Sequence, residues 1–231
     1  MRSLVTLTLG VALIATTQPL ALADNAEETS RLIRVLKDKD EIARRGAAQD
    51  LGKLGPDAKG AAAALADVLT KDKDAFVRRF AAQSLGQIGP EVAKDAVPAL
   101  SKAVKTDTHK EVIQASIEAL GQMGGTAVPA LKEAMKSSEL TVQYQAAKAI
   151  GQIGPDAKDA VKTLIDAFKN PPPMKRNNDA PPVRTAVAEA LGNIGPAAKD
   201  AVPALKESIA DRVRDREFKK AVETALKKIQ G

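Results

Sequence analysis

The chain has 231 residues, with 35 Lys and Arg against 29 Asp and Glu, for a formal net charge of +6. It contains no Cys, no Trp, one His, one Tyr and four Phe, so disulfides, thiolate metal sites and Cys nucleophiles are excluded. One His leaves almost no material for zinc sites or Ser–His relays, and we expect no cofactor, no metal and no catalytic residue. The apolar content of 44% is typical of a folded protein.

The first 23 residues have the three parts of a secretory signal peptide. Arg2 supplies a positive start, residues 4–15 are uncharged and mostly apolar, and Ala21–Ala23 precede Asp24 as a small-residue cleavage site. The apolar core is shorter than the roughly 20 residues that span a bilayer. An uncleaved membrane anchor stays the alternative. We expect cleavage near Ala23 and an exported mature domain, periplasmic or secreted, of residues 24–231.

A six-residue motif recurs along the rest of the chain, at intervals of 34, 35, 30 and 41 residues. It reads Leu or Ile, Gly, a polar residue, an apolar residue, Gly and usually Pro. Its copies begin at Leu51, Leu85, Leu120, Ile150 and Leu191, and a degenerate sixth copy begins at Leu226. Recurrence at this period is typical of proteins whose helical units stack along one direction.

Each copy of the motif is predicted to close a helix. Val77, Ala81 and Leu85 recur at helical spacing, and the same offsets are apolar or small in other copies. The second Gly, such as Gly89, falls where a helix ends in a left-handed residue, and Pro follows it in four copies. The first Gly, such as Gly86, costs about 1 kcal/mol relative to Ala inside a helix. Its recurrence suggests that another backbone packs too closely there for a side chain.

A second apolar helix is expected between successive motif copies. Residues 97–104 place apolar side chains at i, i+3 and i+7, and similar patterns occur before the other copies. Pro98 is expected in the first helical turn, where its missing N–H has no partner to lose. The unit is therefore a first helix, a short polar turn, the motif helix and a Gly-Pro stop. We predict six such pairs from about Glu27 to Gln230.

These helical patterns resemble the HEAT-repeat family, most closely its short bacterial version, the phycobilisome-lyase HEAT-like repeats. The similarity is carried by Ala-Val-Pro-Ala-Leu at 96–100 and by Val-Arg-x-x-Ala-Ala-x-x-Leu-Gly-x-Ile-Gly at 77–89, and it extends over nearly all of the mature chain. It implies an all-α fold, a right-handed α–α superhelix of about six hairpins whose motif helices line the concave side. Because the family consists mostly of scaffolds and adaptors, the resemblance says little about a particular function.

Two features depart from the family pattern. The family has an Arg near the start of each motif helix, and the resemblance suggests that these arginines form a ladder along the stack. In the middle of this chain the Arg is replaced, so the ladder would break there. The corresponding residues are Arg44, Arg78, Ile113, Gln143, Arg184 and Lys219. Residues 170–182 contain five prolines and are predicted to form an extended loop within the fifth pair. Both a functional loop and a neutral insertion stay open for this segment.

One exposed line of the motif helices is the candidate binding surface. It comprises the positions six and two before the motif Leu and two after it, and its six positive and two negative residues give a net charge of +4. We predict a partner-binding groove formed by Arg45, Gln49, Lys53, Arg79, Gln83, Gln87, Gln114, Gln122, Tyr144, Lys148, Gln152 and Asn193. Gln and Arg offer adaptable hydrogen bonding to an acidic or extended ligand. Ordinary solvated helix surface is the alternative interpretation.

No catalytic centre is recognisable in the sequence. His109 stands alone in a predicted turn, and we expect it to be a solvated residue rather than a ligand or a general base. The pairs Asp38/Asp40 and Asp72/Asp74 lie in corresponding turns, where Asp caps the next helix. Carboxylates used as acid and base would need an apolar pocket that separates their pKa values.

The leading hypothesis is an exported, non-catalytic scaffold that binds a protein partner with an acidic or extended surface through this groove. One alternative is a nucleic-acid-binding HEAT-like protein, against which the scarce aromatic residues and the export signal both argue. A second is a chromophore-lyase-like enzyme, suggested only by the family name. Membrane contact is expected only through an uncleaved N-terminal segment.

Overall fold

The computed structural model describes residues 18–171, 182–210 and 215–231, and within these ranges it contains helices and no β-strand. The first helices of the six pairs are α1 (Gln18–Val35), α3 (Ala62–Lys71), α5 (Ala93–Thr106), α7 (Val128–Ala134), α9 (Val161–Lys169) and α11 (Val202–Glu207). The motif helices are α2 (Glu41–Lys53), α4 (Ala75–Ile88), α6 (Lys110–Gln122), α8 (Leu140–Ile153), α10 (Val183–Ile194) and α12 (Arg216–Gln230). The six predicted pairs are confirmed.

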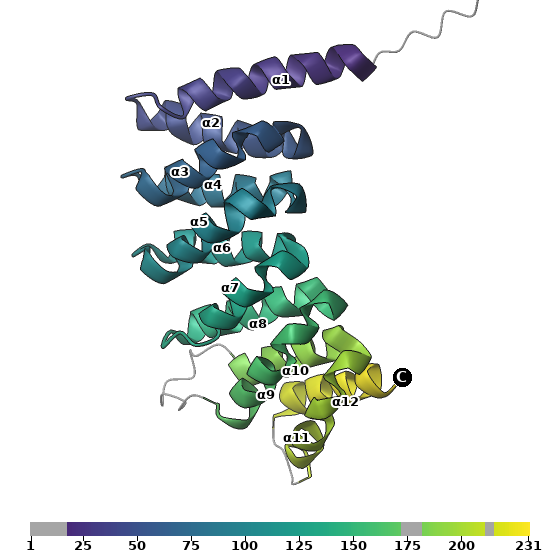
Figure 1. The fold of residues 1–231 in the computed structure, drawn as a ribbon. Helices are drawn as coiled ribbons and strands as arrows, with labels where there is room; N and C mark the ends of the chain where they lie inside the picture. The colour runs from purple at the N-terminus through teal and green to yellow at the C-terminus, as the bar shows by residue number, and fades with distance from the viewer. Residues whose placement is uncertain (1–17, 172–181, 211–214) are drawn as a thin grey trace, which may run out of the picture.

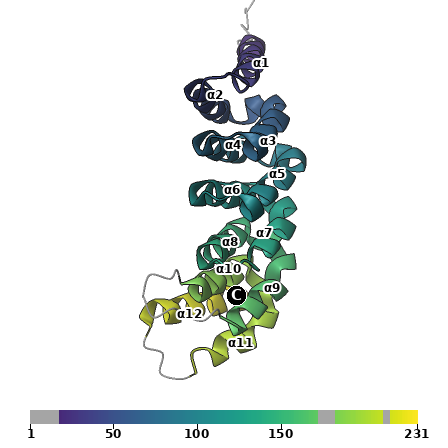
Figure 2. The ribbon, with the colours of Figure 1, turned by 90° about the vertical axis from the view of Figure 1, so that its left-hand side faces the viewer.

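Successive pairs stack into an elongated column (Figure 1). Each even-numbered helix packs against the next even-numbered helix, from α2 through to α12, and so forms one continuous layer. The odd-numbered helices form the other layer, and the column bends so that the even-numbered helices lie on its concave side (Figure 2). The all-α superhelical repeat fold is confirmed, and the motif helices are the ones that line the inner face.

The second Gly of each motif ends its helix as expected, because all five have positive φ values between 57° and 98°. The ψ values of Gly89 and Gly154, −171° and −134°, place them outside the left-handed helical region, in a conformation that is essentially restricted to Gly. The chain then continues into a short 3₁₀ segment. These segments are Gly55–Ala61, Pro90–Val92, Gly124–Ala127, Gly154–Ala160 and Gly195–Ala201. The Gly therefore redirects the chain into the next first helix.

The prediction for Pro98 is wrong. Pro129 and Pro203 are the second residues of α7 and α11, but α5 begins at Ala93 and places Pro98 inside the helix. In this repeat the turn after the motif is α-helical where other repeats have a longer 3₁₀ segment. Pro98 leaves the carbonyl of Lys94 without an intrahelical donor. Lys94 is exposed, so water can reach its part of the helix.

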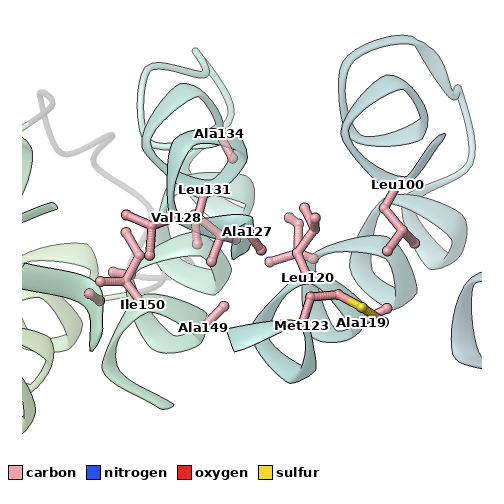
Figure 3. Packing of buried hydrophobic residues seen from close by; sticks show 14 of the residues in the cluster. Leu100, Ala119, Leu120, Met123, Ala127, Val128, Leu131, Ala134, Ala149 and Ile150 are labelled. Carbon is pink, nitrogen blue, oxygen red and sulfur yellow. The ribbon is translucent and has the colours of Figure 1, made fainter. Parts of the chain in front are cut away.

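The core forms one cluster that runs through the column from Leu32 to Ile229, and Figure 3 shows part of its packing, from Leu100 to Ile150. The motif residues Leu51, Leu85, Leu120, Ile150 and Leu191 are completely buried between the two layers. Buried alanines such as Ala119 and Ala149 fill much of the remaining space, which lets neighbouring helices approach closely. The shared core explains the repeat period, because no single pair of helices could bury its own apolar face.

The first Gly of each motif lies where the next motif helix touches the backbone. A Cβ on Gly86 would lie 3.1 Å from the Cα of Ala119, and one on Gly192 would lie 2.7 Å from the Cα of Ala225. Gly52, Gly121 and Gly151 have equivalent neighbours in the next repeat. This confirms the predicted close approach of a second backbone.

The N-terminal helix differs from the expectation. It begins at Gln18 rather than near Glu27, so the predicted cleavage site after Ala23 falls inside α1. Residues 1–17 of the predicted signal peptide, and residues 172–181 of the predicted loop, lie outside the described ranges. Among the described helices, none has the length and apolar character needed to cross a membrane.

Candidate partner-binding groove

The concave face contains three hollows, of about 490, 370 and 240 Å³, lined by motif-helix residues. Eight of the twelve predicted binding residues line them, and these are Gln83, Gln87, Gln114, Gln122, Tyr144, Lys148, Gln152 and Asn193. Arg45, Gln49, Lys53 and Arg79 occupy the same helical register in α2 and α4 and are at least partly exposed, but they do not line these three hollows. The structure therefore brings most of the predicted surface together in the middle and C-terminal parts of the groove.

The middle hollow combines carboxamides with one charge of each sign. Tyr144 is half-buried, and the Nζ of Lys148 lies 5.5 Å from the centre of its ring. The Nε2 of Gln114 donates a hydrogen bond of 2.9 Å to Glu118. Glu118, which the prediction left out, lines both this hollow and the one beside it. The middle of the groove is thus polar and carries both charges.

The carboxamides of the groove also have a packing role. The Oε1 atoms of Gln87 and Gln122 occupy the space that a Cβ on Gly52 or Gly86 would need. The Oε1 of Gln152 lies 3.1 Å from the position of a Cβ on Gly121. Each carboxamide therefore lies over the interior Gly of the preceding motif helix. Its position is set by the contact between repeats.

The C-terminal hollow lies between α10 and α12. Lys228 donates a hydrogen bond of 2.8 Å from Nζ to Oδ1 of Asn193, so a cation and a carboxamide meet across neighbouring repeats. Lys220, Glu189 and Glu217 line the same hollow. Its two cations are therefore offset by two carboxylates, and the positive charge of the candidate line is not evenly spread.

At the N-terminal end of the groove, Arg45 joins two repeats. Its Nε and Nη2 donate hydrogen bonds of 2.9 and 2.6 Å to Asp74, and its guanidinium carbon lies 4.7 Å from the centre of the Phe76 ring. The Arg45 side chain, together with the backbone amide of Val77, lowers the pKa of Asp74 to about 2. The charge of Arg45 is thus largely committed to Asp74, although the sequence suggested a free groove cation.

Arg79 and two exposed apolar residues complete this end of the groove. The guanidinium carbon of Arg79 lies 4.8 Å from the centre of the Phe80 ring and 5.2 Å from that of Phe76. Ile42 and Phe76 are 70% and 50% exposed. Neither residue was predicted as part of the site, yet each stands nine residues before its motif Leu, where later repeats have Glu, Thr or Pro. An apolar residue at a position that is polar in other repeats is the signal that could have revealed them.

The predicted arginine ladder is present in the first repeats and then ends. Arg44 and Arg78 form ion pairs with Asp72 and Asp107 of the following repeat, each with an Nε–oxygen distance of 2.7 Å. Burial raises the pKa of Asp107, but the hydrogen bonds from Arg78 and the His109 amide outweigh it, so that pKa stays below its ordinary value. The ladder ends at the next repeat as predicted.

A different contact links the fifth and sixth pairs. The guanidinium carbon of Arg184 lies 4.6 Å from the ring centre of Phe168 and 4.9 Å from that of Phe218, and the two rings stack 6.0 Å apart. Burial lowers the pKa of Arg184. Here aromatic faces, rather than a carboxylate, hold the arginine in place.

The contacts of His109 and of the carboxylates in the turns are with residues that hold the turns and helix ends in place. The Nδ1 of His109 lies 3.1 Å from Nη2 of Arg78, and its side chain is 52% exposed. Asp40 and Asp74 accept hydrogen bonds from the amides of Ile42 and Val77 and so cap α2 and α4, as predicted. The described residues contain no group of three or more His, Cys, Asp or Glu that could hold a metal ion.

Comparison with known proteins identifies the repeat. A family model described as HEAT repeats matches residues 29–121, 62–138, 97–180 and 142–227, which together cover most of the chain. No curated protein matches the sequence.

Several solved structures are similar in fold. An engineered protein is 26% identical, with a TM-score of 0.57, over 88% of this chain and 96% of its own. The complex of CpcE and CpcF of phycocyanin lyase from Nostoc sp. PCC7120 is 22% identical, with a TM-score of 0.55, over 88% of this chain and 77% of the other. The archaeal HEAT-like repeats protein from Thermococcus onnurineus NA1 is 12% identical, with a TM-score of 0.59, over 92% and 90%. The family match and the stacked helical pairs agree, and the chain belongs to the HEAT-repeat family.

Proposed function

We propose that this chain is an exported, non-catalytic scaffold that binds a protein partner in the groove formed by its motif helices. The observation that carries the proposal is the row of hollows along the concave layer, lined by exposed side chains from neighbouring repeats. A surface built from several repeats can bind a long segment of another protein, because each repeat adds contacts in the same register. The groove, and not a single pocket, is therefore the functional unit.

The partner is a protein with an acidic or extended surface. Carboxamides recur at the same register in α4, α6, α8 and α10, and each can both donate to and accept from a polypeptide backbone. Lys148 and Lys220 supply exposed positive charge in the middle and C-terminal hollows. Since Arg45 is paired with Asp74, we expect a modest salt dependence of association rather than the steep dependence of a phosphate-binding protein.

A binding role, rather than a catalytic one, is supported by the lining of the three hollows. Their lining includes carboxamides, Lys and Glu side chains from neighbouring repeats, which suit polar contacts with a polypeptide. The similarity to the phycocyanin lyase complex concerns the fold alone and does not bring its activity to this chain.

Photo-cross-linking tests the groove. A photoreactive amino acid replaces Gln122 in the groove of the chain expressed in its own cells, and a matched variant carries it at Lys162, which is exposed on α9 in the outer layer. We expect a discrete protein adduct from position 122, identified by mass spectrometry, and none from position 162. Equal adducts from both positions, or nucleic acid as the adduct of position 122, would contradict the proposal.

Export has its own test. Asn25 donates a 2.8 Å hydrogen bond from Nδ2 to Asp57, and a chain beginning at Asp24 keeps this contact. We expect the mature protein in the exported fraction to begin at Asp24, as read by N-terminal peptide mass spectrometry. An intact residue 1–23 segment on cytosolic protein would refute export, and the same segment on membrane-bound protein would favour the anchor.

A further inference from the structure

The groove face of α2 and α4 extends one helical turn beyond the predicted line. Ile42 and Phe76 stand three residues before Arg45 and Arg79, so each apolar residue lies on the same helix face as the arginine that follows it. These two are the large apolar side chains that are exposed in the described part of the chain. They occupy equivalent positions in adjacent repeats, and α2 packs directly on α4. An apolar patch therefore adjoins the N-terminal end of the groove.

The Phe76 ring is held in place by its neighbours. Arg45 and Arg79 place their guanidinium carbons 4.7 and 5.2 Å from its centre, and Arg45 is in turn fixed by two hydrogen bonds to Asp74. The other three Phe residues of the chain, at positions 80, 168 and 218, are half-buried or buried. Phe76 is thus a preorganised exposed aromatic ring, and aromatic residues are enriched at the centres of protein interfaces.

The two arginines differ in how their charge is used. Arg45 has a carboxylate partner, whereas Arg79 forms no hydrogen bond or ion pair with the described residues, and its Nε is buried without a partner. A cation without a carboxylate, next to exposed apolar side chains, complements a ligand that presents an apolar group beside a negative charge. The charge of Arg79 therefore restricts the choice of ligand more than apolar contacts alone would.

We propose that Ile42, Phe76 and Arg79 form an anchor site, at which an acidic protein segment places one large apolar side chain on Ile42 and Phe76 and a neighbouring carboxylate on Arg79. This inference rests on the proposed function, since the segment continues from the anchor site into the groove. It assigns the N-terminal repeats to anchoring and the carboxamides of α4–α10 to the rest of the segment. A second copy of the chain and an anionic membrane are the competing occupants.

Synthetic peptides test the anchor site. A fluorescent peptide with one Leu in a run of Asp and Glu is titrated with the mature chain, and two matched peptides replace the Leu by Ser or the acidic residues by Asn and Gln. Binding, measured by anisotropy, is expected to weaken about tenfold with either replacement. The variants Phe76→Ser, Ile42→Ser and Arg79→Gln are expected to lose the preference for the acidic Leu peptide, whereas Thr141→Ser, at the same register in α8, is expected to keep it.

Each contrary outcome has a definite meaning. Equal affinity for the three peptides, or no binding of any of them, overturns the anchor site. Thermal unfolding checks that Phe76→Ser and Arg79→Gln are folded. Arg79→Gln keeps the Phe76 ring and its contact with Arg45, so it gives an independent reading of the same site. Dimerisation in sedimentation velocity, or binding to phosphatidylglycerol vesicles, that Phe76→Ser abolishes also overturns the proposal. The adduct from position 122 reports on the groove separately, so the anchor site can fail while the proposed function stands.

Discussion

Asp74 connects two repeats and begins a helix with the same carboxylate. It accepts the amide of Val77 at the start of α4 and both donors of Arg45 from α2. Asp72, two residues earlier, pairs with Arg44 in the same way and also accepts the amide of Asp74. Side chains of this polar turn therefore fix how the second repeat is seated on the first. The capping role was predictable from the sequence, whereas the pairing of Arg45 with Asp74 was not.

Asp74→Asn tests this connection through its pH dependence. Asn keeps an acceptor for the helix cap but loses the ion pair, so the free energy of unfolding should fall by up to about 2 kcal/mol at neutral pH. Because the pKa of Asp74 is lowered from 3.8 to about 2, its contribution is complete above about pH 4 and is lost as the pH falls towards 2. Urea unfolding of both proteins from pH 2 to 7 measures the difference. A difference that is the same at every pH would refute the ion pair.

The ladder of Arg44 and Arg78 gives a second prediction. Arg78→Met leaves Asp107, whose side chain is only 7% exposed, without its ion-pair partner. We expect a loss of about 3 kcal/mol in the free energy of unfolding, whereas Arg216→Met, on the exposed surface of α12, should change it little. Urea denaturation of the two variants makes the comparison, and equal effects would show that Arg78 is an ordinary surface charge.

Among the helices, the contact between an interior Gly and a small residue sets the packing of the concave layer. The residue just before the motif Leu, such as Ala119 or Ala225, lies against the Gly of the preceding helix. Larger side chains at the Gly and at the small residue that faces it would push neighbouring motif helices apart. This would change the curvature of the groove. The glycines thus allow the close packing of the motif helices that shapes the groove.

Two Gly→Ala substitutions separate packing from backbone entropy. At Gly192 the added Cβ would lie 2.7 Å from the Cα of Ala225, so Gly192→Ala should destabilise the chain by about 1–3 kcal/mol. At Gly46, also inside a helix, nothing lies within 4 Å, and Gly46→Ala should stabilise by about 0.4–1 kcal/mol. Thermal or urea unfolding gives both values. The same sign for both variants would contradict this explanation of the motif.

The architecture was predictable from the sequence because it depends on residue types that repeat. Gly at helix ends, Leu at buried positions and the period itself are local signals, and they led to the six pairs. That the motif helices line the concave side was implied by the resemblance to the HEAT-repeat family. Contacts between repeats were harder to predict. The pairing of Arg45 with Asp74 spans 29 residues and depends on how one repeat is rotated on the next, which spacing along a single helix does not contain. The predicted position of Pro98 was wrong for a local reason, because the helix that contains it starts earlier in that repeat.

Over the whole molecule, the groove surface is more varied than its sequence line suggested. Its N-terminal end carries exposed apolar side chains and arginines, its middle carries carboxamides with Tyr144, and its C-terminal end carries Lys and Glu together. This order gives the groove a direction, because a bound segment meets different chemistry at each end. A repeat protein with identical units would lack such polarity.

The most direct test of the central claim is the affinity of the partner captured from position 122 for three forms of the mature chain. Isothermal titration calorimetry compares the unmodified chain with Tyr144→Ala in the middle hollow and with Lys162→Ala on the outer layer. Loss of a half-buried aromatic anchor is expected to weaken binding at least tenfold, while the outer substitution leaves the affinity unchanged. An unchanged affinity for Tyr144→Ala, together with a weakened one for Lys162→Ala, would place the partner on the convex side and contradict the account.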